Sequence, residues 1–350
     1  MGEFDLIERY FKRSKAAGPG VALGIGDDCA LLQPRPGTQL AISSDMLVEG
    51  RHFLSTVDPQ ALGHKALAVN LSDLAACGAK PLAFTLALAL PQADETWLAG
   101  FSEGLFELAD AHGCLLVGGD TTRGPLNICI TVFGEIAVVN GQSIALLRSG
   151  AKAGDDLYVS GNLGDARMAL EVFRGNLTVS AEAFALARLR MERPTPRVAL
   201  GQALRGVATA AIDISDGLLG DLGHILKASA VGATVDASIA SKLIANYDHL
   251  TGARAQFDYK NGQKVDFGAL NTQSGYIESI LREFALNGGD DYELAFTAPP
   301  SARQAVACAA LSARTTVTRL GRIDAQAGLR LVDAQGETVR VNAAAFDHFA

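Results

Sequence analysis

The stretch Ala211-Ile212-Asp213-Ile214-Ser215-Asp216 runs from apolar residues into a Ser-Asp turn, and Ala41-Ile42-Ser43-Ser44-Asp45 repeats this pattern near the start of the chain. A short apolar run that ends in turn-forming residues is typical of a buried strand. Ser-Asp is also a common helix N-cap, which would explain either instance by itself. The recurrence favours two related α/β folds, each of which gives carboxylates to one site.

Six short clusters in this chain place aspartate after an apolar or glycine-rich stretch. Besides the two stretches above, they are Gly26-Asp27-Asp28, Leu71-Ser72-Asp73, Gly118-Gly119-Asp120 and Gly288-Gly289-Asp290-Asp291. Carboxylates in such places repel one another and resist desolvation unless positive charge lies among them. Oxygen ligands suit Mg²⁺, which keeps several waters and usually shares its shell with substrate phosphates. The clusters therefore predict a polyphosphate held through metal ions.

Composition sets the broad class of the protein. With 350 residues, 49% of them hydrophobic, the chain is long enough for two packed domains. The formal net charge of −8 argues against nucleic acid as a partner. No apolar run is long enough to span a membrane, and the first residues lack the pattern of a signal peptide. The five cysteines form no Cys-x-x-Cys pair, so we expect reduced thiols and a cytoplasmic protein.

Predicted strands and helices alternate through both halves of the chain, which is the pattern of α/β layers. We expect an N-terminal domain over residues 1–150 and a C-terminal α/β domain over 151–350. Residues 241–276 are polar and poorly periodic, and they are predicted to form an insert on the surface. The predicted strands are 39–43, 82–90, 115–117, 126–139, 156–160, 209–212, 292–297 and 315–323, and the predicted helices are 59–77, 94–112, 165–174, 181–191, 196–205 and 217–228.

Common phosphate-binding signatures are missing from the sequence. There is no Gly-Lys pair anywhere, which excludes a P-loop, and no His-Arg-Asp, which excludes a protein kinase of the usual type. Phosphate contacts would then come from glycine-rich backbone, such as the stretch from Gly118 to Gly124, together with metal.

Motifs spread over nearly the whole chain, in the same order, resemble the thiamine-monophosphate kinase family. They are Gly24-Ile25-Gly26-Asp27-Asp28-Cys29-Ala30, Ser43-Ser44-Asp45 with His52-Phe53, the segment from Lys65 to Ala76, Gly118-Gly119-Asp120-Thr121-Thr122, Arg148-Ser149-Gly150-Ala151, Ile212-Asp213-Ile214-Ser215-Asp216-Gly217-Leu218 and Gly288-Gly289-Asp290-Asp291-Tyr292-Glu293-Leu294.

The resemblance implies the two-domain fold of aminoimidazole ribonucleotide synthetase, in which the N-terminal sheets of two subunits pair into a β-barrel. It also implies a homodimer, ATP as co-substrate, several Mg²⁺ ions and thiamine monophosphate as acceptor. Carried over by position, the residues divide into three sets. The metal residues would be Asp28, Ser43, Ser44, Asp45, Asp73, Asp120, Asp213 and Asp216; the nucleotide residues Gly119, Asp120, Arg148 and Ser215; and the residues facing thiamine phosphate His52, Asp290 and Phe346. Asp27 and Asp291 would support these sets.

The family usually carries Glu where this chain has Asp290, so the charge is kept and the reach is shorter. The implied acceptor is a phosphate monoester that is mostly dianionic at pH 7. It has no proton to lose, so no general base is expected. The difficulty is electrostatic, because two polyanions must be brought into line, and metal ions would neutralise them.

Two other functions remain open on the sequence. Another ATP-using enzyme of the same superfamily, such as selenophosphate synthetase or aminoimidazole ribonucleotide synthetase, would share the fold. A non-catalytic nucleotide sensor would share it as well, although a sensor could lose carboxylates that are needed only in the transition state.

Overall fold

The computed structural model describes residues 2–13, 18–245, 247–251, 257–260 and 273–339. The chain forms two compact units. Unit 1 consists of Met1–Ala145 with Glu192–Arg205, and unit 2 consists of Leu146–Met191 with Gly206–Ala350. A segment distant in sequence, 192–205, thus completes the N-terminal unit. Within the described ranges, no helix combines the length and the apolar character needed to cross a membrane.

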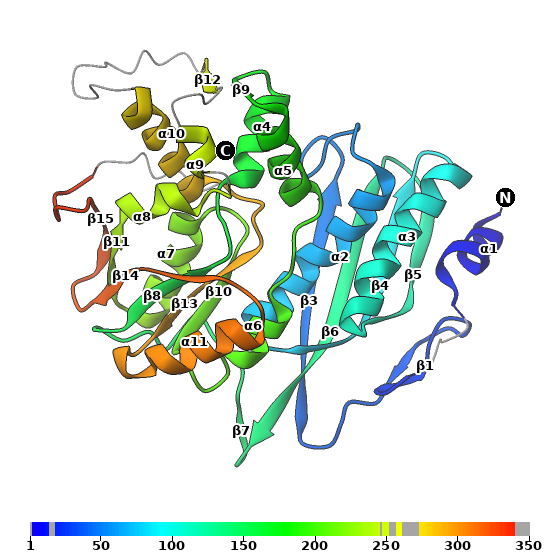
Figure 1. The fold of residues 1–350 in the computed structure, drawn as a ribbon. Coiled ribbons are helices and arrows are strands. Elements are labelled where there is room, and N and C mark those ends of the chain that lie inside the picture. The colour runs from blue at the N-terminus through cyan, green and yellow to red at the C-terminus, as the bar shows by residue number, and fades with distance from the viewer. Residues whose placement is uncertain (1, 14–17, 246, 252–256, 261–272, 340–350) are drawn as a thin grey trace. The chain divides into compact units, whose positions relative to one another are not determined.

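Unit 1 is built on one mixed sheet in the strand order β3-β6-β4-β5 (Figure 1). β6 runs antiparallel to both β3 and β4, and β4 runs parallel to β5. The strand bounds are β3 Thr38–Val48, β4 Lys80–Leu90, β5 Leu115–Arg123 and β6 Asn127–Val139, with β7 Gln142–Ser143 paired to β6 and a separate pair of β1 Val21–Leu23 and β2 Leu31–Leu32. The predicted strand at 39–43 therefore continues through Asp45.

Two long helices, α2 (Pro59–Ala76) and α3 (Glu95–His112), lie side by side against this sheet (Figure 1). An aspartate caps the N-terminus of each helix: Asp58 and the predicted cap Asp94 accept hydrogen bonds from the first backbone N–H groups of α2 and α3. Gly113 ends α3 with a φ of 59°, a left-handed cap. The shorter helices of unit 1 are α1 Glu3–Leu6, η1 Ile7–Phe11 and α6 Val198–Ala203.

The two helices pack backbone against backbone. A Cβ added at Gly63 would lie 2.0 Å from the Phe101 carbonyl oxygen, and one at Gly104 would lie 1.8 Å from the Gln60 carbonyl oxygen. Glycine is therefore required at both positions. The close approach holds α2 firmly, which matters because α2 carries one of the predicted metal residues.

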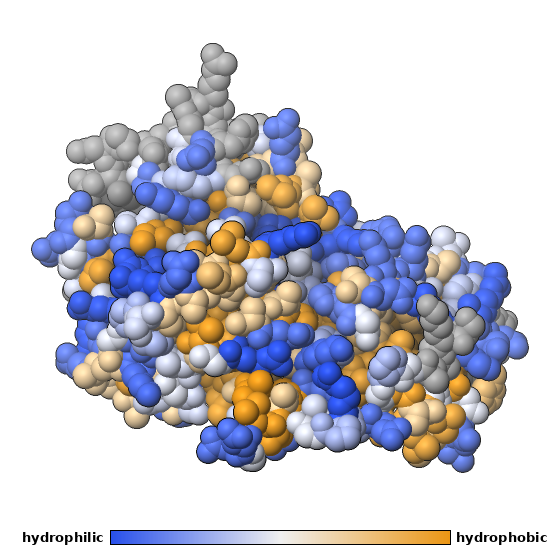
Figure 2. Space-filling model, turned by 60° about the horizontal axis from the view of Figure 1, so that its bottom comes forward, coloured by the Kyte–Doolittle hydropathy of each residue, from blue (hydrophilic) through white to orange (hydrophobic). Residues whose placement is uncertain are grey.

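The sheet of unit 1 leaves apolar side chains exposed on β3. Leu40, Ile42 and Met46 are 41%, 60% and 53% exposed, and they alternate with partly buried residues of the same strand. Successive side chains of a strand point to opposite faces, so these three share one face. Over the described residues the sheet is open and forms no closed barrel. Figure 2 shows a mixture of hydrophilic and hydrophobic residues on the side it presents, as is usual for protein surfaces.

Unit 2 is built on a six-stranded sheet in the order β10-β13-β8-β14-β11-β15. The strand bounds are β8 Asp156–Ser160, β10 Ala210–Ile214, β11 Gly232–Asp236, β13 Glu293–Ala298, β14 Val317–Asp324 and β15 Gly328–Val332, with β9 Leu177–Val179 paired to β12 Phe257–Tyr259. The helices are α4 Asp165–Phe173, α5 Ala181–Glu192, α7 Leu218–Ser229, α8 Ala237–Ala240, η2 Ser241–Leu243, α9 Tyr247–Thr251, α10 Gln273–Asn287, η4 Pro300–Ala302 and α11 Arg303–Ser312. β11, β15, α10 and α11 had no counterpart among the predicted elements, and neither had the short elements β9, β12, α8, η2, α9 and η4.

Part of the predicted insert at 241–276 is ordered structure in unit 2. Leu243 and Leu250 are buried, and β12 pairs antiparallel with β9. The described part of this segment is thus packed against unit 2 rather than lying free on its surface. Its weak periodicity follows from short elements, none of which is long enough to show a helical repeat.

Candidate functional site

Three of the predicted metal residues meet where β3 passes α2. The Ser43 hydroxyl donates to Asp73 Oδ2 at 2.5 Å, and the Asp45 backbone N–H donates to Asn70 Oδ1 at 3.1 Å. Ser43 and Asp45 are two residues apart on β3 and share a face, and Asn70 and Asp73 are three apart on α2 and also share a face. The buried Asn70 was not among the predicted site residues, although its spacing from Asp73 could have identified it. We call Ser43, Asp45 and Asp73 the β3–α2 corner.

Ser44 points away from this corner. Its hydroxyl lies 2.9 Å from the Thr131 hydroxyl and 3.2 Å from the Ile130 carbonyl oxygen on β6. Because strand side chains alternate, Ser44 occupies the face opposite Ser43 and Asp45. The structure does not bring its side chain together with the other residues of the corner.

Gly119 and Asp120 lie on β5, at the far edge of the same sheet. The row of paired residues that begins at Asp45 continues through Ile130 and Leu86 and ends at Gly119. Three strand spacings separate β3 from β5, so Asp45 and Asp120 stand on the order of 14 Å apart. Gly119 has a φ of 145°, and a Cβ there would lie 1.8 Å from the Leu86 carbonyl oxygen. The sheet therefore places Asp120 three strands away from Ser43 and Asp45.

Asp28 and His52 lie outside the regular elements of unit 1. Asp28 is exposed between β1 and β2, and its N–H donates to the Asp27 carboxylate at 2.9 Å. His52 follows β3, and its Nδ1 accepts a hydrogen bond from the Val48 N–H at 3.0 Å. A neutral ring with Nδ1 as acceptor carries its proton on Nε2 and can donate from there.

In unit 2, the Ser215–Asp216 turn follows β10 and is held by Asp221 of α7. Both backbone N–H groups of the turn donate to Asp221 Oδ2, at 3.0 and 3.1 Å. Burial raises the pKa of Asp221 to about 6, against the effect of these hydrogen bonds. Asp213, the other predicted metal residue here, is buried on β10 opposite Leu294 of β13. Sequence reasoning missed Asp221, an acid one helical turn beyond the motif.

Asp290 lies close to the same turn, whereas the exposed Arg148 lies beside the other end of β10. The Ala211 N–H of β10 donates to the Leu147 carbonyl, and the Ser229 hydroxyl donates to the Arg148 carbonyl. Asp290 has a φ of 74°, and its N–H donates to the Ser215 carbonyl at 2.8 Å. A Cβ at the preceding Gly289 would lie 2.4 Å from that carbonyl oxygen. Unit 2 therefore brings Asp213, Ser215, Asp216 and Asp290 to one end of its sheet, and Arg148 lies apart from them.

The donor sets in both units fit a hard cation. They consist of carboxylate and hydroxyl oxygens, the ligands that Mg²⁺ prefers. Within the described ranges, no three or more His, Cys, Asp or Glu side chains are grouped so that they could hold a metal ion. A cation bound at the β3–α2 corner or at the Ser215–Asp216 turn would need further oxygen ligands, which phosphate and water can supply. Phe346 lies outside the described residues.

Two family descriptions match this chain. Residues 26–136 match the AIR synthase related protein, N-terminal domain, and residues 152–334 match the AIR synthase related protein, C-terminal domain. The thiamine-monophosphate kinase of Salmonella typhimurium is 45% identical over 351 residues, which cover 100% of this chain and 98% of the relative.

Solved structures show the same similarity. The crystal structure of thiamine-monophosphate kinase from Stenotrophomonas maltophilia K279a has a TM-score of 0.76 and 43% identity, covering 96% of each chain. A structure described as AaThiL complexed with AMPPCP and TMP has a TM-score of 0.70 and 27% identity, covering 99% of this chain and 96% of that one. With this fold, these motifs and this full-length identity, the chain belongs to the thiamine-monophosphate kinase family.

Proposed function

We propose that this protein transfers the terminal phosphoryl group of ATP to the phosphate of thiamine monophosphate and so forms thiamine diphosphate. The observation that carries the proposal is the 45% identity to a thiamine-monophosphate kinase along the whole chain. The related structure described as a complex with AMPPCP and TMP supports both substrates. The β3–α2 corner and the Ser215–Asp216 turn supply oxygen groups of the kind that such a reaction needs.

The roles of single residues are part of this proposal. Bound Mg²⁺ would neutralise the phosphates and the charge that develops during transfer. The ligands of several such ions would come from Asp28, Ser43, Ser44, Asp45, Asp73, Asp120, Asp213 and Asp216, with Ser44 contributing through its backbone because its hydroxyl faces β6. Gly119, Asp120, Arg148 and Ser215 would hold the nucleotide. His52, Asp290 and Phe346 would face thiamine monophosphate.

The protein's own groups act by positioning. The acceptor phosphate is mostly dianionic at pH 7 and attacks without losing a proton. His52 can donate from Nε2, because its Nδ1 is occupied by the Val48 N–H, and so can orient an anionic acceptor. Arg148 offers a fork of donors to phosphate oxygens. Alignment of the two phosphates is the main contribution to rate in this scheme.

We further propose a homodimer, with the exposed β3 face as the interface and a β-barrel formed by the sheets of two subunits. Leu40, Ile42 and Met46 offer an apolar row that a second copy would bury. The N-terminal domain, residues 1–150, would carry this interface and part of the ATP site, and residues 151–350 would carry the rest. We expect the enzyme to act in the cytoplasm, where ATP is supplied.

The decisive experiment is an assay with ATP, Mg²⁺ and thiamine monophosphate in which thiamine diphosphate is measured directly. Formation of one thiamine diphosphate per ADP supports the proposal. ATP hydrolysis without thiamine diphosphate would contradict it and would favour another enzyme of the superfamily. ATP binding without turnover would favour a nucleotide sensor. Calorimetry with and without a chelator tests the metal, because ATP should bind much more weakly without Mg²⁺.

A further inference from the structure

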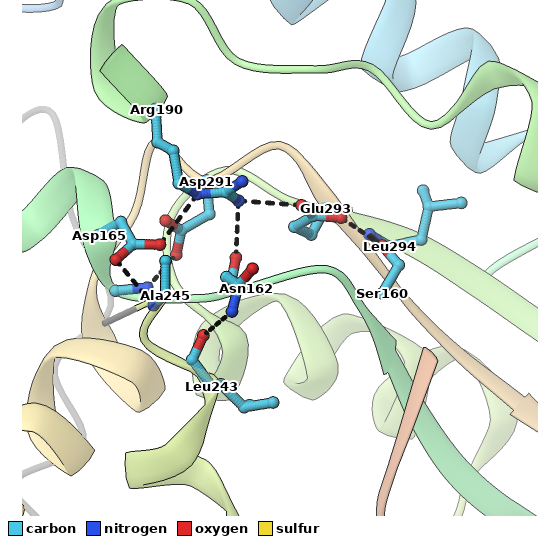
Figure 3. Close-up of polar contacts among 10 residues, drawn as sticks. Ser160, Asn162, Asp165, Arg190, Leu243, Ala245, Asp291, Glu293 and Leu294 are labelled. Atoms are coloured by element: carbon cyan, nitrogen blue, oxygen red, sulfur yellow. Dashed lines mark hydrogen bonds and ion pairs between the residues drawn. The ribbon is translucent and has the colours of Figure 1, made fainter. Parts of the chain in front are cut away.

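Arg190 of α5 lies among three buried carboxylates of unit 2 (Figure 3). Its Nε is 2.9 Å from Asp165 Oδ2 and its Nη2 is 3.0 Å from Glu293 Oε1, while the Asp291 carboxyl lies beside them with a pKa that burial raises well above its usual value (Figure 3). Asp165 and Glu293 are 1% exposed and Asp291 is 4% exposed. Buried carboxylates are costly without a cation, so Arg190 allows these three to lie together.

Each of the three carboxylates also holds a neighbouring segment in place. The Gly164 N–H donates a hydrogen bond to Asp291 at 2.7 Å, and the Ala245 N–H donates one to Asp165 at 3.1 Å. The Ser160 hydroxyl donates one to Glu293 at 2.6 Å. Asp291 and Glu293 belong to residues 288–294, whereas Asp165 and Gly164 mark the start of α4. Arg190 and its three carboxyl neighbours therefore connect the loop 288–294 to β8 and to the start of α4.

On its other side, the same loop is fastened to the Ser215–Asp216 turn. The Asp290 N–H donates to the Ser215 carbonyl and the Tyr292 N–H donates to the Ile214 carbonyl, at 2.8 and 2.9 Å. Asp290 and Tyr292 both have positive φ, 74° and 52°, which side-chain-bearing residues rarely adopt. Such a backbone persists only where its surroundings hold it. The direction of the Asp290 side chain thus depends on attachments at both sides.

We propose that Arg190 is a positioning residue for the acceptor: by holding Glu293, and Asp165 next to the Gly164 N–H that donates to Asp291, it fixes the backbone from which Asp290 reaches thiamine monophosphate. This inference rests on the proposed function, which assigns Asp290 to that substrate. Positioning matters here because aspartate has a shorter side chain than glutamate. Asp290 can therefore compensate less for a small shift of its backbone. Arg190 itself touches no substrate in this scheme.

The test compares Arg190→Lys with wild type in steady-state kinetics. Lysine keeps the charge but cannot reach Asp165 and Glu293 together as the guanidinium does. We expect KM for thiamine monophosphate to rise by about ten- to a hundredfold, the scale of a misplaced contact group. KM for ATP should change less than about twofold, since this loop does not carry the nucleotide residues.

Arg303→Lys is the matched control. Arg303 also forks onto a buried carboxylate of unit 2, Asp156, with contacts of 2.6 and 2.9 Å, but it holds no part of the loop 288–294. Both variants should lose some thermal stability. Only Arg190→Lys should change KM for thiamine monophosphate.

Two further variants keep the inference testable if Arg190→Lys folds poorly. Asp165→Asn retains an acceptor for the Ala245 N–H and removes the charge facing Arg190, so it should raise the same KM more mildly. In an Asp290→Asn background, Arg190→Lys should have little additional effect, because the two residues act on one contact.

The outcomes separate this inference from the proposed function. Wild-type protein that makes no thiamine diphosphate would overturn both. Active wild-type protein in which Asp290→Asn raises KM for thiamine monophosphate, while Arg190→Lys and Asp165→Asn only lower stability, would overturn the positioning role alone. Additive effects in the double variant would overturn it as well.

Discussion

The Ser43 hydroxyl donates a hydrogen bond to the Asp73 carboxylate, with 2.5 Å between Oγ and Oδ2, and so joins β3 to α2. Asp73 is thereby directed toward the face of β3 that carries Ser43 and Asp45. The helix that holds it cannot shift easily, because Gly63 and Gly104 place α2 and α3 in direct backbone contact. The β3–α2 corner therefore holds its oxygen atoms, which could bind a cation, in place before any ligand binds.

Asp73→Asn should therefore leave the fold intact and lower kcat by about a hundredfold or more, the scale of a lost charge contact in the transition state. The amide can still accept the Ser43 hydrogen bond, so stability should change little. Asp58→Asn is the matched control at the other end of α2, where Asn caps a helix as well as Asp does. Normal turnover in a folded Asp73→Asn variant would remove this residue from the metal ligands.

Free thiamine should be a very poor substrate compared with thiamine monophosphate. Its alcohol must lose a proton, and the proposed roles include no base for that step. With thiamine monophosphate, the rate should fall below about pH 6, as the acceptor phosphate takes up its second proton. Rates for both acceptors between pH 5 and pH 9 check this, and His52→Gln should leave the acidic limb in place. Comparable turnover of the two acceptors would rule out direct transfer to the phosphate.

Asp165→Asn should change how stability depends on pH. Burial raises the pKa of Asp165 to about 6, despite the opposing charge of Arg190. The folded state therefore binds this proton more tightly than the unfolded state, and the contribution of Asp165 to the free energy of unfolding falls as pH rises from about 4 to about 6.

The variant has no such proton to lose. Between pH 4 and pH 7 its free energy of unfolding should gain up to about 3 kcal/mol relative to wild type, in urea titrations without ATP or metal. The same substitution at the exposed Asp110 is the control. A difference between Asp165→Asn and wild type that stays constant over this pH range would show that Asp165 does not titrate there.

Ile42→Asp should weaken the proposed dimer, because it places a charge in the middle of the exposed β3 row. Light scattering at micromolar concentration should give the mass of a dimer for wild type and that of a monomer for the variant. Leu311→Asp, at an exposed apolar position on α11, should leave the mass unchanged. A wild-type monomer with full activity would refute the interface.

Much of the local structure follows from the sequence. The caps at Asp94 and Gly113 predict the ends of α3, and apolar runs predict β4 and β6 closely, because these features depend on neighbouring residues alone. The strand at β11 was missed because it is short and only two residues separate it from the end of α7. Local patterns also gave no sign that residues 192–205 would pack with unit 1.

The chemistry of the chain can be read from its amino-acid sequence: acids after apolar segments, no P-loop, and motifs that identify its family. Which of these acids face one another depends on the fold. Asp290 and Asp291 are neighbours, yet one adopts a left-handed backbone beside the Ser215 carbonyl and the other is buried with Arg190. Ser43 and Ser44 likewise separate onto opposite faces of β3. These outcomes depend on partners far away in sequence, which supply the charge and hydrogen bonds that make burial of a polar group possible.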